Sequence, residues 1–272
     1  MLGEKQYKEL KKELDECQRP LFFFDDDPDG LSAFLLFYRY KGEGKGIIVK
    51  THPKLDLTLL PKVEEYNPDK IFILDVAVVE QEFVDKCKRP VIWVDHHGPS
   101  DINNVKYFNP RLKDKGKHCP TSELCYGAVK QDQWIAAVGT VADWFYTDSV
   151  KKFQKKNPKL IPEDLKKAPD VIYNSRLGTL IRVFSFILKG TTNDAMKYIK
   201  VLTRINDPEE ILSQTTAQGK FIWKRFVTIN ELYQRLWKDA RQAVGKETLV
   251  PYVYDANVMS FSADISNEMI YR

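Results

Sequence analysis

Three short apolar runs in the first part of the chain each end in an aspartate. The runs at 21–24, 71–74 and 91–94 are followed directly by Asp25, Asp75 and Asp95. Runs this short, apolar on both faces and separated by helical patterns, are typical of strands buried in a parallel sheet. We therefore predict an α/β fold, a parallel sheet flanked by helices, with these aspartates at one edge of the sheet.

The spacing of apolar residues and the positions of proline and glycine predict the other elements. Helices are expected at 4–17, 31–40, about 80–87, 121–130, 131–146, 220–244 and 262–271, with further strands at 47–49 and 249–254. A short helix is expected between Pro61 and Pro68, a helical region runs to about 205, and Asp207-Pro208 opens another helix. The predicted domains are a catalytic α/β domain at 1–205, a helical linker at 206–245 and the beginning of a small α/β carboxyl-terminal domain at 246–272.

The composition is that of a protein with a sizeable core and no membrane segment. The chain has 272 residues, of which 43% are hydrophobic and 29% charged, and no apolar stretch approaches the roughly 20 residues of a membrane span. The polar, charged start has neither a secretory nor a transit signal. The four cysteines show no paired spacing, which favours reduced thiols. We therefore expect a cytoplasmic protein.

The positive charge of the chain is unevenly distributed. The net charge of +4 permits an anionic partner without requiring one. Seven lysines lie close together: Lys151, Lys152, Lys155, Lys156, Lys159, Lys166 and Lys167. A solvated surface of helix and loop is the simpler interpretation, and a track for phosphate groups is the alternative.

Acidic and imidazole side chains follow the predicted strands in a way that favours a metal centre. Four carboxylates lie within residues 25–29, and carboxylates this close repel one another unless a cation compensates. Asp75, the His96-His97 pair and Asp143 come from three further segments. Carboxylate together with imidazole suits Mn²⁺, and carboxylate alone suits Mg²⁺.

Each of these segments also has a simpler interpretation when it is taken alone. Residues 25–30 could be an acidic turn that caps a helix, Asp75 another helix cap, and Asp143 a hydrogen-bonded helix end. His96 and His97 could be a buried pair. Because the carboxyl ends of parallel strands share one edge of the sheet, a single site with two ions explains all four segments together. Two ions about 3.5–4 Å apart catalyse phosphoryl transfer, and Asp75 is a natural bridging ligand.

These motifs resemble those of the DHH phosphoesterase family, over roughly residues 20–145. Asp25-x-Asp27-x-Asp29-Gly30 resembles the first motif of RecJ-type exonucleases, Asp75 the second, Asp95-His96-His97-Gly98 the third and Gly139-x-x-x-Asp143 the fourth. The resemblance implies two Mn²⁺ ions, with Mg²⁺ as a possible substitute. It implies Asp25 and Asp27 as ligands of one ion, Asp29, His96 and Asp143 of the other, and Asp75 between them. By the same resemblance Asp95 orients a histidine, His97 faces the substrate phosphate, and the catalytic residues are Asp75, His96 and His97.

The resemblance implies a hydrolase that acts on nucleic acid. The form of the first motif favours an exonuclease of single-stranded DNA or RNA, similar to archaeal RecJ-like proteins, some of which associate with a replisome factor or a repair helicase. The alternatives are a phosphodiesterase of short oligonucleotides or cyclic dinucleotides, a pyrophosphatase, and a non-catalytic scaffold in a replication or repair complex. Arg111 is a candidate for binding the substrate. Trp144, Phe145 and Tyr146 could stack on bases, although packing in the core is the more usual role of such residues.

Overall fold

The computed structural model describes residues 1–50, 54–243, 251–255 and 259–272. It forms two compact units, Met1–Val171 and Ile172–Arg272. The sequence analysis placed the domain boundaries after residues 205 and 245 instead. The compact units are defined by packing alone, so the assignment of 1–205 to catalysis and of 246–272 to a further domain stays a prediction.

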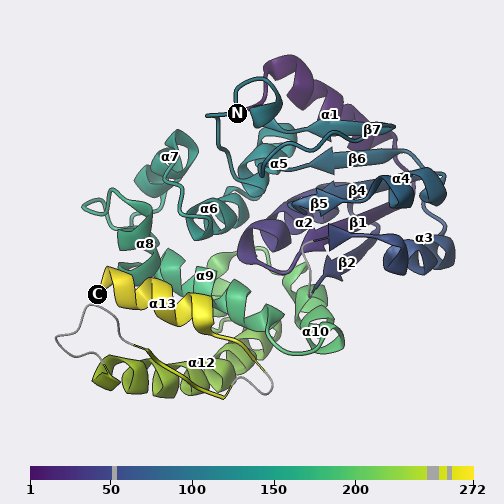
Figure 1. Cartoon of the computed structure of the whole chain (residues 1–272). Helices are drawn as coiled ribbons and strands as arrows, with labels where there is room; N and C mark the ends of the chain where they lie inside the picture. The colour runs from purple at the N-terminus through teal and green to yellow at the C-terminus, as the bar shows by residue number, and fades with distance from the viewer. Residues whose placement is uncertain (51–53, 244–250, 256–258) are drawn as a thin grey trace. The chain divides into compact units, whose positions relative to one another are not determined.

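The first unit is built on a parallel five-stranded sheet, which confirms the predicted fold class (Figure 1). The strands, in spatial order, are β2 (Lys45–Val49), β1 (Pro20–Asp25), β4 (Lys70–Leu74), β6 (Val91–Val94) and β7 (Val105–Phe108). All four pairings are parallel, so the carboxyl ends of the strands lie at one edge. Asp25 ends β1, and Asp75 and Asp95 directly follow β4 and β6.

Both faces of this sheet are covered, because successive side chains of a strand point to opposite faces. On one face Phe23 and Trp93 belong to a buried apolar cluster with Val63 of α3 (Leu60–Tyr66) and Phe83 of α4 (Gln81–Cys87). On the other face Phe22 packs edge-on against Phe34 of α2 (Pro28–Lys41), with ring centroids 5.7 Å apart. Helices α1 (Glu4–Glu16), α5 (Thr121–Val129) and α6 (Gln133–Ala142) pack beside α2. Because helices cover both faces of the sheet, its central strands can be apolar on both sides.

The structure corrects several predicted elements of the first unit. Strand β7, at the edge of the sheet, and the short pair β3 (Lys54–Leu55) and β5 (Val78–Val79) were not predicted. Helix α2 begins at Pro28 rather than at residue 31, since Asp27 caps it and Pro28 occupies its first turn. Helix α6 ends at Ala142 rather than at residue 146. The first unit also contains η1 (Leu57–Leu59), η2 (Pro110–Leu112) and α7 (Asp148–Lys156).

The second unit is helical within the residues described. Helix α8 (Ala168–Asn174) leads into it, and its helices are α9 (Arg176–Leu188), α10 (Thr192–Leu202), α11 (Pro208–Leu212), α12 (Ala217–Ala243) and α13 (Ser262–Tyr271). Asp207 caps α11 as predicted. Helix α12 buries one side, which includes Ile222, Phe226, Ile229, Tyr233 and Ala240. Helix α13 is tied to α9 and α12 by Glu268, whose carboxylate accepts hydrogen bonds from Arg182 at 2.8 Å and Tyr233 at 2.6 Å.

The predicted strand at 249–254 is not formed over residues 251–254, and residues 249 and 250 lie outside the described part of the chain. The predicted end of the preceding helix at residue 244 also lies outside it. Among the described helices, none is by itself long and apolar enough to cross a membrane, although the bent pair α8 and α9 meets that length and composition jointly. The four cysteines are all unpaired and buried.

Candidate metal centre

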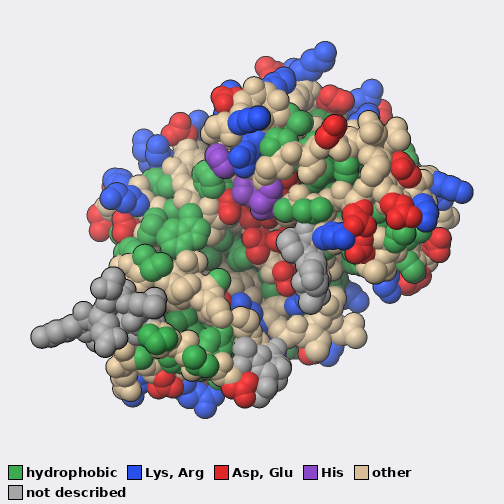
Figure 2. Space-filling model, in the orientation of Figure 1, with side chains coloured by type: hydrophobic (Ala, Val, Ile, Leu, Met, Phe, Trp, Pro, Cys, Tyr) green, Lys and Arg blue, Asp and Glu red, His purple; other side chains and the backbone are tan. Residues whose placement is uncertain are grey.

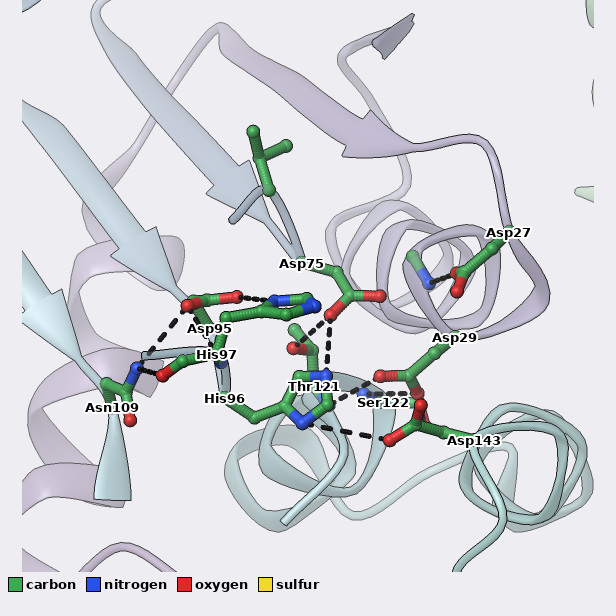
Figure 3. Close-up of polar contacts among 12 residues, drawn as sticks. Asp27, Asp29, Asp75, Asp95, His96, His97, Asn109, Thr121, Ser122 and Asp143 are labelled. Carbon is green, nitrogen blue, oxygen red and sulfur yellow. Dashed lines mark hydrogen bonds and ion pairs between the residues drawn. The ribbon is translucent and has the colours of Figure 1, made fainter. Parts of the chain in front are cut away.

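The four predicted motif segments meet at the carboxyl edge of the sheet (Figure 3). His96 lies at their centre. Its Nε2 is 3.3 Å from Oδ1 of Asp75, and its Nδ1 is 3.7 Å from Oδ2 of Asp143. Two sets of residues each bring their ligand atoms within 4.8 Å of one another. One set is Asp75, His96 and His97, and the other is Asp29, His96 and Asp143. The second set matches the ligands that the family resemblance implies for one ion.

Asp29 is buried and is held by the start of helix α5. One carboxylate oxygen accepts a hydrogen bond from the backbone N–H of Thr121 at 2.7 Å, and the other accepts from the backbone N–H of Ser122 at 3.1 Å and from its hydroxyl. The Thr121 hydroxyl donates to Oδ1 of Asp75 at 2.9 Å. The first residues of α5 thus orient two acids of the site. Neither contact was predicted from the sequence.

Asp25 and Asp27 belong to neither of the two sets of ligand atoms. Oδ1 of Asp27 accepts the backbone N–H of Gly30 at 2.8 Å, which caps helix α2. Asp27 therefore caps α2, which is one part of the simpler interpretation of residues 25–30. Asp25, at the end of β1, is partly buried. Their role as ligands of a second ion stays a prediction.

The third motif is held by Tyr107 of β7 and by Asn109, which directly follows β7; the sequence analysis missed both residues. His97 Nδ1 donates to Oδ1 of Asp95 at 2.7 Å, as expected for a residue that orients a histidine. Asn109, which is 1% exposed, donates through Nδ2 to the carbonyl oxygen of His97 at 3.0 Å. Tyr107 donates to Oδ2 of Asp95 at 3.3 Å and stacks on Trp93. These contacts fix the backbone and the ring of His97.

Arg111, the predicted substrate-binding residue, is positioned by the same asparagine. Oδ1 of Asn109 accepts the backbone N–H of Arg111 at 2.9 Å, while the Arg111 guanidinium donates to the carbonyl oxygen of Lys115 at 3.3 Å. Arg111 is half-buried and belongs to neither ligand set. No pattern in the sequence indicated Asn109, because the strand before it is half-exposed and has the mixed sequence Val-Lys-Tyr-Phe.

Burial and mutual repulsion make these carboxylates resist ionisation. Burial, followed by the charge of Asp27, raises the pKa of Asp25 to about 7. Burial, followed by the charge of Asp29, raises the pKa of Asp27 to about 6 and of Asp143 to about 8, and holds the pKa of Asp75 well above its usual range. Burial lowers the pKa of His96, which keeps its ring neutral. The hydrogen bond to Asp95 raises the pKa of His97.

We expect the metal-free protein to lose stability as the pH rises from about 4 to about 8. The unfolded chain releases these protons near the usual carboxyl pKa of about 3.9. The folded state keeps them until the pH reaches about 6, 7 and 8 for Asp27, Asp25 and Asp143. The folded state therefore binds more protons over this interval, and the free energy of unfolding falls as the pH rises.

The measurement is urea unfolding in EDTA at about pH 5 and about pH 8. We expect a decrease on the order of 2–4 kcal/mol, since a three-unit shift of one carboxyl corresponds to about 4 kcal/mol before solvent screening. Added Mn²⁺ should remove most of the decrease, because the cation compensates the ionised acids. A free energy of unfolding in EDTA that is constant or rises over this range would contradict the expectation.

The residues of the site fit a divalent cation. Nδ1 of His96 and Oδ2 of Asp143 are buried, and neither has a hydrogen-bond partner among the described residues. A neutral imidazole and clustered carboxylates are ligands suited to Mn²⁺, and the carboxylates also suit Mg²⁺. Figure 2 shows histidine and acidic side chains together at the surface, with basic side chains nearby. Of the residues in the two sets, His97 and Asp143 are partly exposed, and Asp29, Asp75 and His96 are buried.

Three comparisons relate this chain to known proteins. The family model described as DHH family, N-terminal domain, matches residues 21–164. A search of curated protein sequences found no match. Among solved structures, RecJ from Thermus thermophilus in complex with Mn²⁺ is 18% identical with a TM-score of 0.63, over 88% of this chain and 39% of that one.

Two further solved structures share this fold. An exonuclease RecJ bound to manganese is 18% identical with a TM-score of 0.62, over 89% of this chain and 70% of the other. The DHH domain of a member of the S1p family of ribosomal proteins is 13% identical with a TM-score of 0.62, over 90% and 63%. The chain thus spans well under half the length of the Thermus protein.

Proposed function

Because this chain belongs to the DHH family, we propose that it is a metal-dependent phosphodiesterase that hydrolyses single-stranded DNA or RNA from an end. The observation that carries the proposal is the convergence of Asp29, Asp75, His96 and Asp143 at the carboxyl edge of the sheet. Buried acids with raised pKa values destabilise a protein unless a cation compensates them, so a structural role does not explain the cluster.

The proposed cofactor is a pair of Mn²⁺ ions, for which Mg²⁺ could substitute. When bound, two such ions would supply an activated water and neutralise charge on the phosphorus centre. Asp29, His96 and Asp143 would hold one ion, Asp25 and Asp27 the other, and Asp75 would lie between them. The solved RecJ structures in complex with manganese and magnesium support the choice of ions.

His97 would bind the substrate phosphate. Its Nδ1 is committed to Asp95, and its side chain remains 42% exposed, so Nε2 is the ring atom available to a phosphate oxygen. The raised pKa of His97 favours the protonated ring, which donates a charge-assisted hydrogen bond. Arg111, placed by Asn109 on the segment that follows β7, is proposed as a second phosphate ligand.

A phosphodiesterase of short oligonucleotides or cyclic dinucleotides and a non-catalytic scaffold are the alternatives. The intact ligand sets favour an enzyme over a scaffold, since a scaffold has no need of clustered buried acids. A replication or repair protein as partner and a cytoplasmic location are part of the proposal. The unpaired cysteines support the location.

The test uses single-stranded DNA and RNA labelled at either end, incubated with Mn²⁺ and, as a control, with EDTA. Release of mononucleotides that requires Mn²⁺ would support the exonuclease, and the labelled end that is lost first gives its polarity. Cleavage confined to di- to tetranucleotides would favour the small-substrate enzyme. If neither long strands nor di- to tetranucleotides are hydrolysed, then the proposal of an enzyme is contradicted and the non-catalytic scaffold remains.

A further inference from the structure

The loop between strand β7 and helix α5 concentrates positive charge. We call residues 111–118 the basic loop, which contains one acid, Asp114, and four basic side chains: Arg111, Lys113, Lys115 and Lys117. The three lysines are exposed, and Arg111 is half-buried. Among the residues that the structure describes, no ion pair links Lys113 or Lys115 to a carboxylate. The sequence analysis identified only Arg111 of this group.

The start of the basic loop is attached to the third motif through Asn109. Oδ1 of Asn109 accepts the backbone N–H of Arg111 at 2.9 Å, and its Nδ2 donates to the carbonyl oxygen of His97 at 3.0 Å. Asn109 is 1% exposed, so water competes little for these bonds. One buried amide therefore holds both the first basic residue of the loop and the histidine proposed to bind the substrate phosphate.

The end of the basic loop is attached to the fourth motif and to helix α5. The ring of His118 stacks on Phe145, which lies two residues after Asp143, with centroids 6.4 Å apart and an interplanar angle of 27°. Three residues after His118, the Thr121 hydroxyl donates to Oδ1 of Asp75 at 2.9 Å. Both ends of the loop therefore lie at the metal centre, and Figure 2 shows basic side chains beside the histidines.

The interior of the basic loop is fixed by its own hydrogen bonds. Oδ1 of Asp114 accepts the backbone N–H of Gly116 at 3.0 Å, and the carbonyl oxygen of Asp114 accepts the backbone N–H of Lys117 at 2.9 Å. Nε of Arg111 donates to the carbonyl oxygen of Lys115 at 3.3 Å. The one acid of the loop thus stabilises its turn, and a loop with a fixed backbone loses little conformational entropy when a ligand binds.

We propose that the basic loop binds the backbone phosphates of a single-stranded nucleic acid on one side of the phosphate that is hydrolysed. The reacting phosphate would lie at His97, the next at Arg111, and the following ones along the three lysines. The loop contains no phenylalanine, tyrosine or tryptophan, so it would contact the backbone without stacking on bases. This inference rests on the nuclease activity proposed above and adds the residues that hold the rest of the strand.

The salt dependence of binding in EDTA tests the loop without depending on turnover. The probe is a fluorescein-labelled oligothymidylate of about 12 nucleotides, followed by fluorescence anisotropy. The variant K113Q/K115Q/K117Q should lower the magnitude of the slope of log K against log salt by about 2, because each phosphate neutralised on a single strand contributes about 0.7. The matched control K152Q/K155Q/K156Q removes the same charge from exposed lysines of α7 and should leave the slope unchanged.

An abasic strand of equal length tests whether the loop contacts the backbone alone. The loop variant should weaken binding of the abasic strand and of the oligothymidylate by the same factor, since both carry the same phosphates. A larger loss for the oligothymidylate would overturn the proposed backbone contact. A slope that is unchanged in the loop variant, or that falls as much in the α7 control, would overturn the assignment to this loop.

The proposals of the nuclease and of the basic loop fail separately. In Mn²⁺ the loop variant should raise KM for the long strand about tenfold with kcat unchanged, because only binding of the distant phosphates is lost. KM for a dinucleotide should not change, since its single phosphodiester does not reach the lysines. A reduced salt slope without any hydrolysis would support the loop and remove the nuclease. Hydrolysis with a salt slope and KM that are insensitive to the loop would support the nuclease and remove the loop.

Discussion

Replacing Asp75 by asparagine should reduce Mn²⁺-dependent hydrolysis at least about 1000-fold, because the variant loses the carboxylate between the two sets of ligands. Asp75 is 1% exposed and lies 3.3 Å from Nε2 of His96. Its φ is 63°, a left-handed conformation that asparagine tolerates and alanine does not favour. Asparagine can also accept the hydrogen bond of the Thr121 hydroxyl. Asp75→Asn therefore removes the carboxylate and keeps the local structure, whereas Asp75→Ala would also disturb the backbone.

The measurement combines hydrolysis of a labelled single strand, titration with Mn²⁺ and urea unfolding in EDTA. Asp75→Asn should bind Mn²⁺ more weakly and should be more stable than the wild type in EDTA at about pH 8, since burial raises the pKa of Asp75 and asparagine does not carry this cost. Asp26→Asn is the matched control. It removes one charge from the same acidic run at an exposed position that we do not assign to a ligand, and it should hydrolyse within about threefold of wild type. Wild-type turnover by Asp75→Asn would exclude the proposed centre.

The architecture of the first unit was predictable because its strands are buried on both faces. The runs that became β1, β4 and β6 consist of apolar residues, and only a sheet covered on both sides buries such short runs. Strand β7, with the sequence Val-Lys-Tyr-Phe, lies at the sheet edge and is half-exposed, so its pattern resembles a loop. The two-residue strands β3 and β5 are too short for any pattern to indicate.

The gathering of the site was also predictable, because residues that follow parallel strands share one edge. The structure brings Asp29, Asp75, His96, His97 and Asp143 together, and their roles as ligands remain predictions. The contacts that orient them could not be predicted. The contacts of Ser122 with Asp29 and of Asn109 with His97 join segments that meet only through tertiary packing.

One error at the first motif was avoidable. Asp207-Pro208 was correctly interpreted as a helix start, and Asp27-Pro28 carries the same signal. The helix begins at Pro28, so Asp29 and Gly30 lie in its first turn rather than in a loop. Asp27 then caps the helix, and Asp29 projects from it toward the start of α5. Gly30 therefore lies in the first turn of α2, where its Cα approaches the backbone of Asp25.

Replacing Gly30 by alanine should destabilise the protein by about 2–4 kcal/mol and lower turnover about 100-fold. A Cβ at Gly30 would lie 2.8 Å from the backbone carbonyl oxygen of Asp25 and 2.9 Å from its backbone nitrogen. Neither atom can move without shifting the end of β1. The first turn of α2 would have to move instead, and it carries Asp29 and the N–H that Asp27 caps. A displacement of this kind misplaces the acids relative to His96.

Gly98→Ala is the matched control, since a Cβ there meets nothing within 4 Å. Both substitutions remove the same conformational freedom from the unfolded chain, so the difference between their free energies of unfolding isolates the native contact at Gly30. Urea unfolding in Mn²⁺ and hydrolysis of a labelled single strand are the two measurements. Gly30→Ala should also bind Mn²⁺ more weakly than wild type, because the carboxylate of Asp29 moves with the helix. If the two alanine variants are equally stable and Gly30→Ala retains wild-type turnover, then the close approach of α2 to β1 does not set the geometry of the first motif.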